Sequence, residues 1–86
     1  MRLIAFHLRA FEDYSEWSRT DKKLFERIRR IIVETAQTPF EGIGKPEPLK
    51  HQLRGYWSRL LTDEHRLIYK VTDESLIIAS CKYHYD

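Results

Sequence analysis

The stretch HRLIYKVTDESLIIASCKYHY, residues 65–85, decides the fold class because it predicts two strands joined by a tight polar turn. From His65 to Val71, apolar and polar side chains largely alternate, as in a strand with one buried face. Asp73 and Glu74 mark the turn, and Ser75 to Tyr85 is predicted to be the last and longest strand. Gly55 to Leu61 precedes this pair as a further strand, so the C-terminal half predicts antiparallel hairpins.

The N-terminal half predicts one strand and two helices. Arg2 to Phe6 is a short apolar run that suits a strand, and Leu8 to Ser18 has aromatic residues at helical spacing. A longer helix follows, with Thr20 as its expected N-cap and Pro39 beyond its end. We therefore expect an α+β fold in one domain, residues 1–86, with the N-terminal strand and two helices packed on one face of a small antiparallel sheet.

Composition excludes several classes of protein. The chain has 86 residues, of which 42% are hydrophobic and 13% aromatic, and a net charge of only +2, which argues against a disordered segment. Only three glycines are present and none forms a phosphate-binding loop, which excludes a dinucleotide-binding fold. Cys81 is the only cysteine, so neither an internal disulfide nor a Cys-based zinc site is possible. With no signal-peptide or membrane run, we expect a cytoplasmic protein.

A long loop is predicted from Thr38 to Leu53, because this stretch contains all three prolines and two of the three glycines. Long ordered loops are often functional. Positive charge gathers in residues 45–70, which contain six basic residues and three acidic ones. The basic residues are Lys45, Lys50, Arg54, Arg59, Arg66 and Lys70. Basic side chains interleaved with aromatic ones suit single-stranded nucleic acid, although a solvated charged surface fits the same pattern.

The residue types present favour acid–base chemistry on an RNA phosphodiester over other reactions. The four histidines have no metal-binding spacing, and no Ser or Cys nucleophile motif is visible. RNA supplies its own nucleophile, the 2′-hydroxyl, so a base, a cation and an acid suffice without a cofactor. The chain offers Glu47, Lys50, Arg66, His84 and Tyr85 for these roles. From the pattern alone, the same residues also fit a solvated carboxylate, surface charges and packed terminal aromatics.

Two long runs of this sequence resemble the YoeB-type (Txe) toxins of the RelE-like toxin–antitoxin superfamily. They are TPFEGIGKPEPLKHQLRGYWSR, residues 38–59, and DEHRLIYKVTDESLIIASCKYHY, residues 63–85. The motifs GKPEPLK, GYWSR, EHRLIY and YHY occur in that order, and the resemblance extends over nearly the whole chain. It implies a RelE-like fold and a ribosome-dependent messenger-RNA endonuclease.

The resemblance also implies roles for individual residues. The general base of the family corresponds to Glu47, its phosphate-contacting arginine to Arg66, and its general acid to His84. Lys50 matches a lysine that helps to neutralise the scissile phosphate, and Tyr85 matches a tyrosine that orients or stacks on the substrate. The residues themselves agree with the choice of acid, because an unperturbed histidine titrates near neutrality.

The partners that the resemblance implies are a YefM/Phd-type antitoxin, the 70S ribosome with its messenger RNA, and a second copy of the chain in a homodimer. Operator DNA is expected only through the antitoxin, and no membrane is expected.

Two positions depart from the family pattern, since Asp86 follows the usual terminal tyrosine and Leu60 stands where many relatives have a second arginine. Two other functions remain open from sequence: a gyrase poison of the ParE type, and a non-catalytic antitoxin-binding co-repressor.

Overall fold

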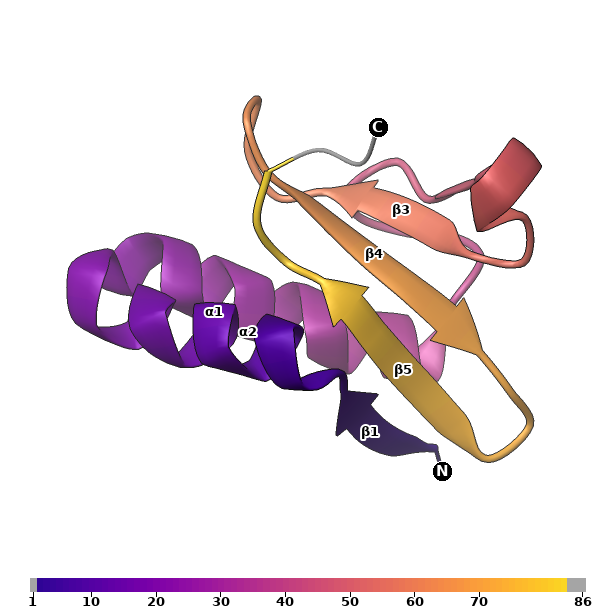
Figure 1. Cartoon of the computed structure of the whole chain (residues 1–86), viewed down its shortest axis with the longest axis horizontal. Coiled ribbons are helices and arrows are strands. Elements are labelled where there is room, and N and C mark those ends of the chain that lie inside the picture. The colour runs from indigo at the N-terminus through magenta and orange to yellow at the C-terminus, as the bar shows by residue number, and fades with distance from the viewer. Residues whose placement is uncertain (1, 84–86) are drawn as a thin grey trace.

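The computed structural model describes residues 2–83. A strand, β1, precedes two helices, and four further strands and one short 3₁₀ helix follow them (Figure 1). Their bounds are β1 Leu3–Phe6, α1 Leu8–Thr20, α2 Lys22–Gln37, β2 Glu47–Pro48, η1 His51–Leu53, β3 Trp57–Leu60, β4 Arg66–Val71 and β5 Ser75–Ser80. The predicted α+β class is therefore confirmed.

The strands form one sheet in the order β1-β5-β4-β3-β2. From β2 to β5 each neighbouring pair is antiparallel, but β1 runs parallel to β5, with Leu3 opposite Ser75 and Phe6 opposite Ile78. The sheet is thus mixed, and the expectation of a wholly antiparallel sheet was wrong in this detail. The reason is topological, because β1 and β5 are neighbours in the sheet but are separated in the chain by two helices and three strands, and no tight turn joins them.

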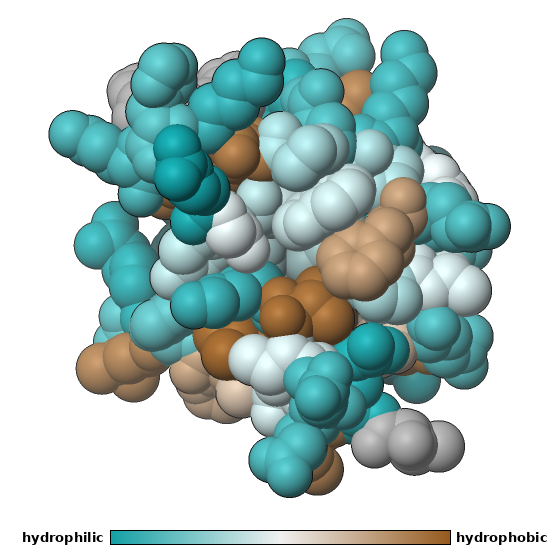
Figure 2. Space-filling view, turned by 90° about the vertical axis from the view of Figure 1, so that its right-hand side faces the viewer, coloured by the Kyte–Doolittle hydropathy of each residue, from teal (hydrophilic) through white to brown (hydrophobic). Residues whose placement is uncertain are grey.

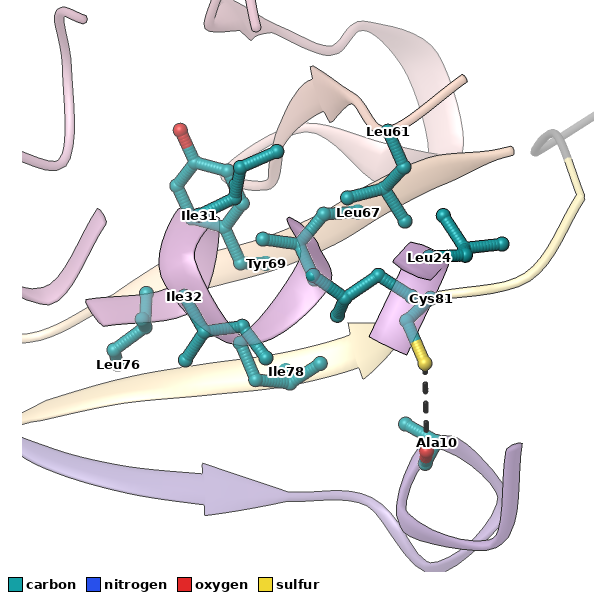
Figure 3. Packing of buried hydrophobic residues seen from close by; sticks show 11 residues of the cluster. Ala10, Leu24, Ile31, Ile32, Leu61, Leu67, Tyr69, Leu76, Ile78 and Cys81 are labelled. Carbon is teal, nitrogen blue, oxygen red and sulfur yellow. Dashed lines mark hydrogen bonds between the residues drawn. The ribbon is translucent and has the colours of Figure 1, made fainter. Parts of the chain in front are cut away.

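The core lies between the helices and the sheet. Ile28 and Ile31 of α2 are fully buried against Leu67 and Tyr69 of β4 and Ile78 of β5. Figure 3 shows side chains of these elements converging on one interior, with the Cys81 thiol pointing at the Ala10 carbonyl of α1. Each fully buried large apolar side chain contributes roughly 1.5–3 kcal/mol, so this cluster holds the helices on the sheet.

The break between the helices lies one residue later than predicted. Asp21, rather than Thr20, is the N-cap of α2, because its Oδ1 accepts a hydrogen bond from the Leu24 amide at 3.0 Å. The Thr20 hydroxyl instead donates to the Glu16 carbonyl, and Thr20 is the last residue of α1. Neither helix is long and apolar enough to span a membrane, judged over the part of the chain that is described.

The last strand ends at Ser80 and not at Tyr85, so it is no longer than β4. A register shift at Ile68/Tyr69 interrupts the pairing of β4 with β5. Beyond it, the Cys81 carbonyl accepts a hydrogen bond from Trp17 Nε1 at 3.3 Å, and the Cys81 thiol donates to the Ala10 carbonyl at 3.6 Å. Contacts with α1 therefore draw the chain out of the sheet.

Candidate active site

Glu47 lies on β2, the two-residue edge strand within the predicted loop. It pairs with Ser58 of β3, and the next residue, Pro48, pairs with Trp57. Leu49 is buried and its amide donates to the Tyr56 carbonyl at 2.9 Å, which fixes the segment to the sheet. The exposed Glu47 side chain is thus carried on ordered backbone, although the sequence predicted only a loop here.

Arg66, the first residue of β4, comes close to Glu47 across β3. Its Nη1 lies 3.6 Å from Glu47 Oε1 and donates to Ser58 Oγ at 3.3 Å. The Arg66 side chain is 24% exposed and that of Glu47 56% exposed, so the ion pair is open to solvent and weak. Two of the predicted site residues, distant in sequence, therefore meet at one position on the sheet.

The chain that leads to His84 is fixed beside Arg66. The Arg66 amide donates to the Tyr83 carbonyl at 3.1 Å, and the Tyr83 amide donates to His65 Nδ1 at 2.8 Å. The predicted acid His84, with Tyr85 and Asp86, lies outside the described residues. Their roles remain predictions, but the described chain reaches the Arg66 backbone one residue before His84.

Lys50 lies with Glu47 around a hollow of about 300 Å³, which residues 47–51 line. The Lys50 side chain is exposed, as a cation for a phosphate would be. A larger pocket, about 640 Å³, lies between β1 and α2 and is lined by Arg2, Ile4 and Val33 among others, but by none of the described site residues Glu47, Lys50 and Arg66. The smaller hollow is therefore the one associated with the candidate chemistry.

Within residues 2–83, three residues other than glycine have positive φ: Lys45 at 53°, His51 at 58° and Tyr83 at 61°. Such left-handed backbone is uncommon for residues with side chains and gathers at functional sites. Lys45 stands two residues before Glu47, His51 directly follows Lys50, and Tyr83 directly precedes His84. Among the described residues, backbone strain at non-glycine positions is thus confined to the segments that carry the candidate site.

Arg59 supports the long loop, a role that the sequence analysis did not identify. It is fully buried and its guanidinium donates to Glu34 Oε2 at 3.0 Å and to the Tyr69 hydroxyl at 3.3 Å. It also donates to the carbonyls of residues 38, 41 and 43, so it holds the first half of the long loop. Because this side chain is buried, Arg59 does not belong to the basic surface in which the sequence placed it.

The remaining cations of that segment do lie at the surface. Lys45, Lys50, Arg54 and Lys70 are exposed, and Arg66 is half-buried. Figure 2 shows the end of the molecule that carries η1 and the β4–β5 turn, and its surface is largely hydrophilic. Within residues 2–83, no three His, Cys, Asp or Glu side chains are grouped so that they could hold a metal ion.

Comparison with known proteins agrees with these features. Residues 6–85 match the model of the YoeB-like toxins of bacterial type II toxin-antitoxin systems. The chain is 58% identical over 76 residues to toxin YoeB of Escherichia coli K12, and the aligned region covers 88% of this chain and 90% of that protein.

Two solved structures from Staphylococcus aureus are also similar. The YoeB dimer has a TM-score of 0.90 at 47% identity, with 98% of each chain covered. YoeB in the YoeB-YefM complex has a TM-score of 0.89 at 47% identity, covering 99% of this chain and 100% of that one. The RelE-like fold is thereby confirmed, and with a family match over nearly its whole length the chain belongs to the YoeB-like toxins of bacterial type II toxin-antitoxin systems.

Proposed function

We propose that this toxin is a metal-independent endoribonuclease that cuts messenger RNA in the A site of the ribosome. The observation that carries the proposal is the convergence at Arg66. Its side chain lies 3.6 Å from Glu47, while its backbone holds Tyr83, the residue before His84. A carboxylate and a guanidinium thus lie close to Tyr83, the residue before His84. Cleavage by the 2′-hydroxyl uses a base, a cation and an acid, and these are the roles proposed for Glu47, Arg66 and His84.

In the proposed reaction, Glu47 takes the proton of the 2′-hydroxyl, whose oxygen attacks the adjacent phosphorus. Arg66 and Lys50 stabilise the extra negative charge on the phosphate oxygens. His84 gives a proton to the departing 5′-oxygen, so the products are a 2′,3′-cyclic phosphate and a 5′-hydroxyl. Tyr85 orients the substrate.

The resting ion pair between Glu47 and Arg66 suits this scheme. Because both side chains are partly exposed, their separation costs little, about 0–1 kcal/mol. A phosphate offers Arg66 two oxygens and a charge-assisted, bidentate contact that is stronger than the open pair. Substrate binding would therefore draw Arg66 to the phosphate and free the Glu47 carboxylate to act as the base.

The proposed partners follow from the surface and from the relatives. The exposed cations Lys45, Lys50 and Arg54 suit the phosphate backbone of ribosomal and messenger RNA. Since relatives from Staphylococcus aureus have been solved as a dimer and as a complex with YefM, we extend both states to this chain, with a YefM/Phd-type antitoxin as its inhibitor. Operator DNA would be reached only through that antitoxin, and the toxin would act in the cytoplasm as a single domain.

The test is cleavage of messenger RNA on programmed 70S ribosomes, comparing wild type with Arg66→Met. Loss of a group that stabilises the transition state costs about 10²–10³ in rate, so Arg66→Met should be slower by that factor. Lys70→Met is the matched control, because Lys70 is an exposed cation on the same strand but is directed at the Tyr56 ring. Equal rates for wild type and Arg66→Met would contradict the proposal. No cleavage by folded wild type would favour a gyrase poison or a non-catalytic co-repressor.

A further inference from the structure

Each residue between β5 and His84 is held by contacts with other parts of the fold. Cys81 is fixed by Trp17 and Ala10 of α1. The Lys82 ammonium lies over the Trp17 ring, 5.6 Å from its centroid, and the Lys82 carbonyl accepts a hydrogen bond from Ser80. The last described residue, Tyr83, is held at both backbone groups by residues 65 and 66.

His65 is the unusual member of these contacts, because it fixes backbone with its imidazole. Its Nδ1 accepts the Tyr83 amide at 2.8 Å, so Nδ1 carries no proton and the neutral ring is protonated at Nε2. That Nε2 faces Glu64 Oε1 at 3.6 Å. The His65 side chain is 9% exposed and its ring is packed edge-on against Trp17, with centroids 4.9 Å apart, so the orientation of the ring is fixed.

The bond from Tyr83 to His65 maintains a backbone conformation that Tyr83 does not favour. Tyr83 has φ 61°, which is costly for a bulky side chain and persists only where surrounding contacts enforce it. Without the His65 acceptor, Tyr83 could relax to the ordinary negative φ, a rotation on the order of 120°. The backbone would then change direction at Tyr83, the residue that precedes His84.

We infer that His65 is a positioning residue of this toxin, which acts through the Tyr83 backbone by fixing the point from which the chain continues to His84. The inference rests on the proposed function, because it assigns His65 a part in placing the general acid. His65 itself touches no substrate. Its contribution is to hold the start of the C-terminal segment in one conformation, and even a misplacement of about 1 Å at a reacting group can cost about 100-fold in rate.

A pair of amide substitutions separates positioning from packing. In His65→Asn the side-chain oxygen can stand where Nδ1 stands and still accept the Tyr83 amide, whereas in His65→Gln the amide reaches the position of Nε2. On programmed 70S ribosomes, we expect His65→Asn to keep kcat within about twofold of wild type. We expect His65→Gln to lower kcat about tenfold with KM unchanged, the effect of one lost hydrogen bond and a displaced acid. Equal kcat for His65→Gln and wild type, or equal losses in both variants, would overturn the inference.

A spectroscopic measurement tests the same contact without relying on cleavage. In wild-type toxin, the ¹⁵N shifts of the His65 ring should show the Nε2-protonated form, and the Tyr83 amide should exchange slowly with solvent. His65→Gln should lose that protection and His65→Asn should keep it. A ring protonated at Nδ1, or a rapidly exchanging Tyr83 amide in wild type, would refute the inference. If His65→Gln is too unstable to assay, these wild-type measurements alone test the positioning role of His65.

The two measurements separate failure of this inference from failure of the proposed function. If wild type cuts no RNA while the His65 ring and the Tyr83 amide behave as expected, the contact exists and the nuclease function is wrong. If wild type cuts and His65→Gln cuts equally fast with an unprotected Tyr83 amide, the function stands and the positioning role of His65 is wrong.

Discussion

Replacement of Arg59 by methionine should separate folding from catalysis in this toxin. Methionine keeps much of the length of the arginine side chain but removes the guanidinium. The change leaves Glu34 without its cation and removes the hydrogen bonds to the carbonyls of Thr38, Glu41 and Ile43. The first half of the long loop loses its attachment to β3.

The expected cost is a large part of the stability of a small protein. Removal of one partner of a buried ion pair costs about 3–5 kcal/mol, because the other charge is left unpaired. The Glu34 side chain is 40% exposed and regains some solvation, which lowers the cost, but the loop carbonyls lose a charged donor, which raises it. We therefore expect a loss of about 4 kcal/mol in the free energy of unfolding, with a fall in Tm on the order of 20 °C.

The assay is thermal and urea unfolding followed by circular dichroism, with Arg66→Met as the matched control. Arg66 is also an arginine paired with a glutamate, but that pair is exposed, so its loss should cost at most about 1 kcal/mol. Arg66→Met should therefore remain stable and lose RNA cleavage, while Arg59→Met loses stability. If Arg59→Met unfolds at the same temperature as wild type, the buried guanidinium does not support the loop and the reasoning is refuted.

Three further predictions concern the helix cap, the thiol and the loop. Asp21→Ala should lower the free energy of unfolding in urea by about 1 kcal/mol and Thr20→Ala by less, and the reverse order would contradict the capping assignment. Burial raises the pKa of the Cys81 thiol from 9.0 to about 12, so iodoacetamide at pH 8 should label the unfolded protein only. The folded thiol then binds its proton more tightly than the unfolded one. The Cys81 contribution to the free energy of unfolding should therefore be present below pH 9 and fall as pH rises toward 12. If the free energy of unfolding of Cys81→Ala falls with pH in this range as steeply as that of wild type, the prediction is wrong. Gly44→Ala should lower the free energy of unfolding by about 1–3 kcal/mol, and by more than Gly55→Ala does. Both glycines have positive φ, but only at Gly44 would an added Cβ meet a backbone oxygen of β3, at 3.0 Å. Equal urea midpoints for the two variants would contradict this.

The sequence predicted strands and turns correctly where neighbouring residues in the chain determine them. The polar turn at Asp73 and Glu74 between two apolar runs predicted the β4–β5 hairpin, which the structure contains. The end of β5 could not be predicted, because Trp17 and His65 hold the chain after Ser80 through contacts with distant segments. The parallel direction of β1 likewise depends on the path of the whole chain rather than on its own residues.

The sequence predicted which residues belong to the candidate site, but not the contacts between their side chains. Glu47, Lys50 and Arg66 came from their motifs, and the structure adds the contact between Glu47 and Arg66. His84 and Tyr85 remain predictions. Arg59 could not be recognised from sequence, because a basic residue in a strand resembles a surface charge until Glu34 and the loop carbonyls are seen around it.

The most direct test of the proposed function is to map both ends of messenger RNA cut on programmed 70S ribosomes by wild type and by His84→Ala. The proposed mechanism predicts wild-type cuts within the A-site codon, with a 2′,3′-cyclic or 3′-phosphate upstream and a 5′-hydroxyl downstream, and a rate for His84→Ala lower by about 10²–10⁴. Ends with a 3′-hydroxyl and a 5′-phosphate, cuts that are independent of the ribosome, or no cuts by folded wild type would contradict it.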